Sequence, residues 1–486
     1  MVDGMYGHEP PTRLKIRDLV LLEACPATRG SRTQMPKAQL TRWVAVADAV
    51  GEWYRSEVGT EDINDIEQQQ MGWLDPVQRD ITSSLFATYR QIMPKAAGDM
   101  IEVDSSFSEV WDTQVNATIS AASQLSVTSG DTTERVKIKI GRSRVSPEEK
   151  AVLIEGADDP NVAFIEVNVS AGEIDEITME AKERTETISR LFSIPEATKG
   201  QKGTVPGLHC YQCERPTRCG QYPSRDPNRT GSESRGVLIS KKWLAKLPTC
   251  QRQVAWARLY GIPTDEGDED SEYARLGSSF HQGAATALLA DDPNAAFAVH
   301  AATAPGSEQA DLLQLWNNHV RLVETEPFPV DVRETEYGIG VTYYATGVYI
   351  DSKDREHPDR IVAITMAGFA DAVGRETDGT PAVVELRTGG GSSLPNEPEL
   401  YALGAHLLSG KTPVTVHTHR IGNSSDLECQ RQVFDSTELD AAGEVLEDAA
   451  AVIASWHPNN ALSPSYSVGG WCHWCLFEAR CVSYRG

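Results

Sequence analysis

The chain has 486 residues, of which 40% are hydrophobic and 24% charged, a globular composition that excludes a largely disordered or fibrous protein. No stretch approaches the roughly 18 apolar residues of a membrane span, and the N-terminus has no apolar signal core, so we expect a soluble, cytoplasmic protein. A net charge of −25, with 14 Lys against 31 Arg, indicates either a halophilic protein or an acidic mesophilic one. This charge counts against nucleic-acid binding, but only weakly if strong salt screens it to within about 3 Å.

Eight of the nine cysteines form one pattern that occurs twice. In each copy a lone cysteine precedes a C-x2-C-x5-C triplet: Cys25 precedes Cys210, Cys213 and Cys219, and Cys250 precedes Cys472, Cys475 and Cys481. The repeat predicts a duplication, with units at residues 1–222 and 237–486 and a linker at 223–236 that is rich in Gly, Pro, Ser and Arg. Each unit is expected to be closed by its own four-cysteine site.

Four thiolates suit a 4Fe–4S cluster or a structural zinc ion, and the third alternative is unligated thiols. Zinc ribbons usually carry two short C-x2-C pairs, whereas here one remote cysteine joins a compact triplet, which favours iron–sulfur. Either metal would tie the start of a unit to its end and stabilise the fold. The ninth cysteine, Cys429, follows neither pattern and is interpreted as a packed core thiol.

The coarse pattern of the second unit is typical of a mixed α/β layer fold. Helical spacing of apolar residues predicts helices, and alternating or continuous apolar runs predict strands. In chain order we expect helices at 240–261, 271–290 and 311–326, strands at 341–350, 360–373 and 381–388, a helix at 397–410, a strand at 413–422 and a last helix at 438–456.

Two carboxylates stand on neighbouring expected strands. Asp371 and Glu385 flank the short turn RETDGTP, so both could reach one end of a sheet. With His281 they would make a hard-ligand set for Mg²⁺ or Mn²⁺, which can orient a water against a phosphodiester. Taken alone, such residues are more often solvated surface groups.

Six segments in a fixed order resemble one family. They are ISKKWLAKLPTCQRQ, LGSSFHQG, GFADAV, VVELRTG, ELYALGAHLL and WCHWCLFEARC. Residues 237–486 thereby resemble the RecB-like branch of the PD-(D/E)XK nuclease superfamily, in which a four-cysteine iron–sulfur cluster occurs. That branch includes CRISPR-associated RecB-type exonucleases and the nuclease domain of AddB-type recombination helicases.

The resemblance implies a fold and a set of site residues. The fold would be two restriction-endonuclease-like units in tandem. His281, Asp371 and Glu385 would bind Mg²⁺ or Mn²⁺, and Tyr401 matches the tyrosine of the family's Q-x-x-x-Y motif. The 4Fe–4S ligands would be Cys250, Cys472, Cys475 and Cys481, and in a second cluster Cys25, Cys210, Cys213 and Cys219.

Two residues depart from the family pattern. Arg387 stands where the family has its catalytic lysine, and arginine cannot shed a proton near neutral pH. Glu397 stands where the family has the glutamine of Q-x-x-x-Y. Lys353 and Lys411 are the downstream lysines that could substitute.

The first unit reads as a degenerate copy. Aligning NVAFIEVNVSAG with PAVVELRTGGG sets Glu166 against Glu385 and Asn168 against Arg387, and Arg144 falls where Asp371 should be. We therefore expect this unit to be catalytically inactive and to keep its cluster for stability or DNA contact.

The resulting hypothesis is a metal-dependent DNA nuclease, exonuclease-like, acting on single strands or duplex ends in repair, recombination or defence, with Arg387 contacting the scissile phosphate. One alternative is a catalytically inactive iron–sulfur protein that binds nucleic acid with a nuclease fold. Another is a redox-sensing iron–sulfur protein unrelated to DNA cleavage. No G-x-x-x-x-G-K-[ST] motif is present, so any unwinding would come from a partner such as a helicase or another repair or defence protein.

Overall fold

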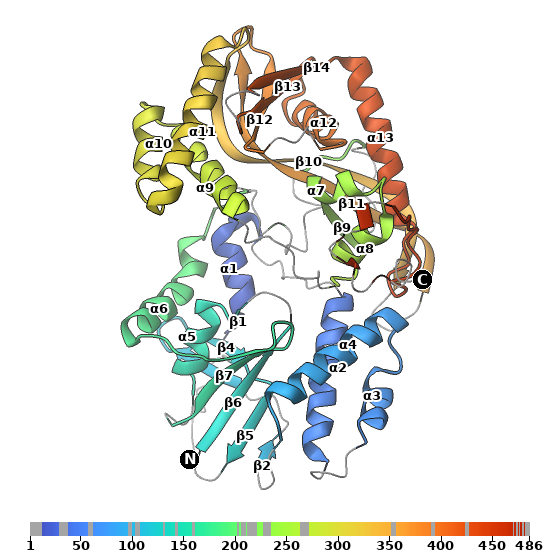
Figure 1. Cartoon of the computed structure of the whole chain (residues 1–486). Coiled ribbons are helices and arrows are strands. Elements are labelled where there is room, and N and C mark those ends of the chain that lie inside the picture. The colour runs from blue at the N-terminus through green and yellow to red at the C-terminus, as the bar shows by residue number, and fades with distance from the viewer. Residues whose placement is uncertain are drawn as a thin grey trace, which may run out of the picture. The chain divides into compact units, whose positions relative to one another are not determined.

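The computed structural model describes residues 12–28, 37–56, 62–95, 100–102, 107–129, 132–140, 144–157, 161–201, 204–205, 210, 221–226, 235–262, 272–350, 356–389, 394–422, 427–469, 471–472, 475, 477–478 and 481 (Figure 1). The chain divides into two compact units, Met1–Val205 and Pro206–Gly486. This division precedes the expected limit at residue 222. The reason is that the side chain of Tyr222 is buried with Leu238 and Ala367, so the end of the expected first unit packs with the second unit.

The first unit contains two sheets. Its elements are β1 (Thr12–Lys15), α1 (Ile16–Ala24), η1 (Pro26–Thr28), α2 (Lys37–Arg55), α3 (Ile63–Met71), α4 (Pro76–Ile92), β2 (Met100–Glu102), β3 (Phe107–Asp112), β4 (Ala117–Ala122), β5 (Leu125–Ser129), β6 (Thr132–Lys139), α5 (Pro147–Glu155), β7 (Ala163–Asn168), β8 (Glu173–Glu176) and α6 (Ala181–Ala197). One sheet has the strand order β1-β4-β3 and the other β2-β5-β6-β7-β8.

The second unit is built on one sheet. Its elements are β9 (Arg235–Ser240), α7 (Lys241–Lys246), α8 (Gln251–Arg258), α9 (Glu272–Ala287), α10 (Pro293–Ala301), α11 (Gly306–Thr325), β10 (Val330–Ile350), β11 (Glu356–Glu376), β12 (Pro381–Arg387), α12 (Glu397–Ser409), β13 (Val414–Arg420), β14 (Glu428–Phe434) and α13 (Ser436–Ala454). The strand order is β10-β11-β12-β13-β14, and β9 pairs with β11.

Strand directions follow the same order in both units. In the second, β10–β11 and β11–β12 are antiparallel, β12–β13 parallel and β13–β14 antiparallel. In the first, β2–β5 and β5–β6 are antiparallel, β6–β7 parallel and β7–β8 antiparallel. A parallel pair needs a crossover, and this is α5 in one unit and α12 in the other. A short strand, β1 or β9, also runs parallel to β4 or β11 and leads directly into a helix.

Helices cover both faces of the second sheet (Figure 1). Phe280, Phe297 and Trp316, from α9, α10 and α11, are buried against Val384 and Leu386 of β12. Helices α12 and α13 pack against the sheet and against each other. Across the part of the chain that the structure describes, no helix combines the length and apolar character needed to cross a membrane.

The helix expected over 240–261 is two helices. α7 ends at Lys246 and α8 begins at Gln251, with Cys250 as its N-cap residue. Pro248 lies between them and lacks the N–H that a continuous helix would need. Cys250 therefore stands at a helix junction rather than inside a helix.

Candidate active site

Antiparallel pairing of β11 and β12 brings two carboxylates together. Ala372 pairs with Val384, so Asp371 and Glu385, the residues that flank this pair, share the opposite face of the sheet. Asp371 Oδ2 accepts a hydrogen bond from the backbone N–H of Leu386 at 2.6 Å. Asp371 Oδ1 lies 2.5 Å from Nδ1 of His281, which α9 supplies and whose side chain is 31% exposed. The predicted His–Asp pair thus forms, and solvent can reach it.

Glu385 is buried and held by Lys241 and Tyr401. Lys241, the first residue of α7, donates from Nζ to Glu385 Oε1, and its Nζ lies 2.7 Å from the Tyr401 hydroxyl. The Tyr401 hydroxyl is 3.1 Å from Glu385 Oε2 and 2.8 Å from the carbonyl of Phe369. The carboxylate of Glu385 is therefore fixed on both oxygens by groups from two helices.

Arg387 and Glu397 form a second charged pair beside Glu385. Arg387 Nη2 donates to Glu397 Oε2 and lies 3.5 Å from Glu385 Oε1. Glu397 Oε1 is 3.1 Å from Lys241 Nζ. Glu397 and Arg387 both depart from the family pattern. Glu397 therefore bridges Arg387 and Lys241.

Burial and neighbouring charges shift the pKa values of these groups. Burial, with Asp371 and Glu397 nearby, raises the pKa of Glu385 despite the ammonium of Lys241. Burial opposes protonation of His281, but its hydrogen bond to Asp371 outweighs this and raises the His281 pKa. Burial likewise opposes the charge of Lys241, but Glu385 and Glu397 outweigh it and raise the Lys241 pKa. The site is therefore a dense set of mutually coupled charges.

A further carboxylate lies near this set. Glu336 of β10 has a φ of 49°, in the left-handed region that non-glycine residues rarely adopt. Burial and the charge of Asp371 raise the Glu336 pKa. Such backbone strain tends to occur at functional sites. Sequence reasoning missed Glu336 because it lies on no motif.

The donor set fits a divalent cation chemically. Asp371, Glu385 and His281 offer carboxylate oxygens and an imidazole nitrogen, and carboxylates outnumber cations here. Among the described residues, these three are not a group whose ligand atoms all lie within 4.8 Å of one another. Glu385 is engaged by Lys241 instead.

Sequence reasoning also missed Lys241. Of the lysines named as substitutes, Lys353 lies outside the described residues, and Lys411 is exposed on the loop before β13, away from Glu385. The available signal was weak: a lysine on the first turn of a helix opposes the helix dipole, and such a local conflict can mark a functional position.

The four cysteines of the second unit gather where the unit closes. Burial raises the pKa of the Cys475 thiol, and the neighbouring Cys250, Cys472 and Cys481 raise it further. Trp256 of α8 donates to the carbonyl of Ala461 at 2.7 Å, so the start and end of the unit are tied together. Within the described ranges, no three of these thiol sulfurs lie within 4.8 Å of one another.

The first cysteine set is described only in part. Cys25 is buried after α1, in the first unit, and Cys210 belongs to the second unit. Cys213 and Cys219 lie outside the described residues. The first four-cysteine site therefore stays a prediction.

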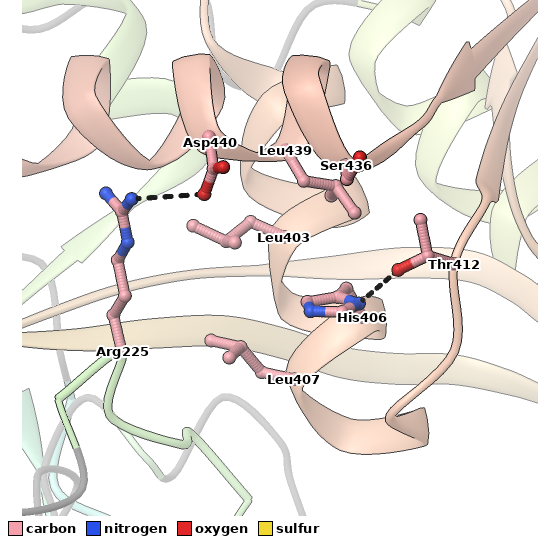
Figure 2. A pocket seen from close by; sticks show the side chains of 8 residues that line it. All are labelled: Arg225, Leu403, His406, Leu407, Thr412, Ser436, Leu439 and Asp440. Carbon is pink, nitrogen blue, oxygen red and sulfur yellow. Dashed lines mark hydrogen bonds and ion pairs between the residues drawn. The ribbon is translucent and has the colours of Figure 1, made fainter.

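A pocket between α12 and α13 is separate from these sites (Figure 2). Its charged and polar lining includes Arg225, which lies 3.6 Å from Asp440, and His406, which lies 3.1 Å from the Thr412 hydroxyl. None of its lining residues is a predicted site residue.

Comparison with known proteins identifies the second unit. Residues 239–482, about half of the chain, match the family model described as the PD-(D/E)XK nuclease superfamily. A solved structure described as "Crystal structure of SSO0001" is 16% identical, with a TM-score of 0.22, over 51% of this chain and 86% of that one. At this TM-score the likeness does not define a common fold. No curated protein matches the chain.

Proposed function

The chain belongs to the PD-(D/E)XK nuclease superfamily, and from this premise we propose that its second unit is a metal-dependent DNA nuclease. It acts as an exonuclease on single strands or duplex ends, in repair, recombination or defence. The observation that carries the proposal is the convergence of Asp371, Glu385 and His281 with Lys241 and Tyr401 at β11 and β12 of the sheet.

His281, Asp371 and Glu385 would hold Mg²⁺ or Mn²⁺. The bound ion would orient a water and stabilise charge that develops on the phosphodiester. Glu385 must be ionised and His281 neutral to serve as ligands. Because both pKa values are raised, each residue must lose a proton to reach its ligating form.

Lys241 supplies the ammonium that the family draws from the position of Arg387. An ammonium is a compact charge on a flexible stem, so Lys241 can leave Glu385 and contact a phosphate or the attacking water. Tyr401 keeps the Glu385 carboxylate oriented through its hydroxyl.

Arg387 binds DNA phosphate rather than taking the lysine's role. Its guanidinium stays charged at any working pH, and Glu397 fixes its position. Its side chain is 21% exposed, so a phosphate can reach it from solvent. This assigns Glu397 a positioning role for both Arg387 and Lys241.

The second unit belongs to the RecB-like branch and carries a 4Fe–4S cluster on Cys250, Cys472, Cys475 and Cys481. The support for an iron–sulfur cluster over zinc is the sequence pattern, in which one remote cysteine joins a compact triplet, whereas zinc ribbons usually carry two short C-x2-C pairs.

The first unit is a degenerate copy of the second. The support is the shared order of strand directions, the shared crossover helix and the short parallel strand that leads into a helix before Cys25 or Cys250. In this correspondence β6 takes the place of β12, and β7 the place of β13. This correspondence does not place Glu166 against Glu385, because Glu166 lies on β7.

The cellular context follows from the chemistry of the family. The nuclease works with a helicase or another repair or defence protein that exposes its substrate. The charge of −25 suits a protein that works in high salt, which screens the repulsion between an acidic surface and phosphate.

One observation favours the alternative of an inactive iron–sulfur protein that binds nucleic acid. Both oxygens of Glu385 are already engaged by Lys241 and Tyr401, and Arg387 is engaged by Glu397. If these contacts persist, Glu385 and Arg387 are not available for metal or phosphate. The protein would then keep the nuclease fold and bind DNA without cutting it.

Degradation of end-labelled single-stranded and duplex DNA separates the two functions. Anaerobically purified full-length protein, with Mn²⁺ in molar KCl, should degrade DNA from an end, and Glu385→Gln should not. Equal degradation by both proteins would place the activity elsewhere. No degradation by either, with iron content intact and DNA retained in a binding assay, would support the inactive alternative.

A further inference from the structure

A second cluster of ligating side chains lies on the other face of the sheet. His417 and His419 of β13 pair with Val384 and Leu386 of β12, whereas Glu385 pairs with Thr418. Because side chains alternate along a strand, the two histidines point away from the face of Glu385. The cluster is therefore independent of the candidate active site.

Sheet register and the end of a helix bring four ligands together. His419 of β13 pairs directly with Cys429 of β14, and His417 lies two residues away on the same face. Glu326, the C-cap residue of α11, completes the group. One ligand atom from each of the four residues lies within 4.8 Å of the others.

His417 has the supporting contacts that are typical of a metal ligand. Its Nε2 lies 2.7 Å from Glu376 Oε1, and Arg431 holds Glu376 with bonds of 2.6 Å and 2.8 Å. Its Nδ1 faces Glu326 Oε1. A metal-binding histidine commonly donates its other ring N–H to a carboxylate, which fixes the tautomer and aims the free nitrogen at the metal.

His419 is left without a hydrogen bond. Its side chain is 3% exposed, and neither ring nitrogen has a hydrogen-bond partner among the described residues. Its Nε2 lies 3.4 Å from Glu326 Oε2. A buried polar group without a partner costs about 1–3 kcal/mol, so native structures rarely leave one unsatisfied.

An arrangement without metal explains only part of the cluster. A protonated His417 between Glu326 and Glu376 would balance charge locally and leave the thiol of Cys429 donating to Glu326 at 3.2 Å. It would still leave His419 unsatisfied. A cation bound by all four groups accounts for His419 as well.

We propose that Glu326, His417, His419 and Cys429 bind a structural Zn²⁺ ion. Two imidazoles, a carboxylate and a thiolate are a donor set that zinc accepts with tetrahedral geometry, and one glutamate plus one thiolate neutralise its charge in a buried site. Four protein ligands leave no open position, so the ion is structural. It joins the end of α11 to β13 and β14, behind the strand that carries Glu385.

The test is the zinc and iron content of the full-length protein, expressed without added metal, by inductively coupled plasma mass spectrometry. His419→Ala and Cys429→Ser should each contain one zinc per chain less than the wild type, with iron unchanged. The matched control is His406→Ala, a histidine of the pocket in Figure 2 that contacts Lys411 and Thr412, and it should keep the zinc. Equal zinc in all four proteins would overturn the proposal.

X-ray absorption at the zinc edge of the wild type keeps the test decisive if the variants fail to fold. The proposed site predicts a shell of one sulfur and three nitrogen or oxygen atoms. A shell of four sulfurs would assign the zinc to the four-cysteine site, and absence of zinc would also contradict the proposal.

Discussion

β12 of the second unit and β6 of the first occupy the same place in strand order, but they carry different charged residues. On β12, Glu385 and Arg387 face α12, where Glu397 binds the arginine. On β6, Lys137 and Lys139 face α5, where Glu149 lies 3.2 Å and 3.7 Å from their ammonium groups. The same strand–crossover framework therefore holds a glutamate and an arginine at the strand end in one unit and two lysines in the other.

The helix that follows the short parallel strand differs in the same way. α7 begins with Lys241, which contacts Glu385, whereas α1 begins with Ile16, which is buried in the apolar core of the first unit. Lys137 of β6 is itself positively charged, so unlike Glu385 it needs no lysine opposite it. The shared strand order and directions therefore do not determine the chemistry of a unit, whereas a few side chains at the strand ends do.

The largest expected effect separates the two units directly. Asp371→Asn removes the charge that His281 contacts and the cation would need, and should lower Mn²⁺-dependent cleavage by on the order of 10³-fold or more. Glu166→Gln in the first unit keeps an oxygen that can accept a hydrogen bond from the N–H of Val145. This variant should leave cleavage within about twofold of the wild type, because Glu166 does not lie on the strand that corresponds to β12. Cleavage is measured as the initial rate on labelled DNA. A comparable loss of cleavage in both variants would mean that both units contribute to it.

Lys241→Met gives α7 an apolar first residue, as α1 has. Cleavage should fall by roughly 10²-fold, the usual contribution of a positioned acid–base or charge-stabilising group. Lys241→Arg should recover little, because a planar guanidinium cannot reproduce a compact ammonium. Unchanged single-turnover rates in Lys241→Met would remove this lysine from the reaction.

Cysteine substitutions test whether each four-cysteine set binds its own cluster. Wild-type protein purified without oxygen should hold about eight iron atoms, and Cys250→Ser should lose about four of them and lower the melting temperature of the second unit. Cys25→Ser should lose the other four and leave Mn²⁺-dependent cleavage intact. An iron count of about four in the wild type would mean that only one unit carries a cluster.

The pH profile of cleavage is a smaller effect. Glu385 and His281 both have raised pKa values and both must lose a proton to become ligands, so cleavage should increase as pH rises through neutrality and be lost in acid. In His281→Gln the remaining activity should depend less steeply on pH. A profile that falls with rising pH would contradict these ligand roles.

Arg387→Lys should have the smallest effect. It restores the residue that the family has at this position, but Lys241 already supplies an ammonium and Glu397 can pair with either cation. We expect cleavage within about 10-fold of the wild type in kcat, with weaker DNA binding, because lysine lacks the guanidinium fork that can bind a phosphate with two hydrogen bonds. A large gain in kcat would instead show that Arg387 holds the catalytic position.

Local patterns predicted much of the second unit. The strands of Glu385 and His417 and the helices of His281 and Tyr401 lie within the expected ranges, and β11, which carries Asp371, extends beyond its expected range at both ends. The expected turn between Asp371 and Glu385 brings them to one face because antiparallel register is a local property. By contrast, Pro248 divides a stretch that helical spacing alone could not separate.

What sequence could not supply were contacts between distant segments. Lys241 is separated from Glu385 by 144 residues, and no spacing rule connects them. Cys429, interpreted as a core thiol, joins a cluster only through cross-strand pairing with His419 and the end of α11. Alignment of Glu166 with Glu385 followed local similarity of apolar strands, which does not encode strand order.

The central claim is that the second unit alone carries the divalent-metal site of the nuclease. Mn²⁺ binding, measured by electron paramagnetic resonance on anaerobic protein in molar KCl, tests it without a DNA substrate. We expect tight Mn²⁺ binding by the wild type and by Lys137→Met and Glu166→Gln, and loss of that binding in Glu385→Gln. Retention of tight Mn²⁺ by Glu385→Gln, or its loss in either first-unit variant, would contradict the account.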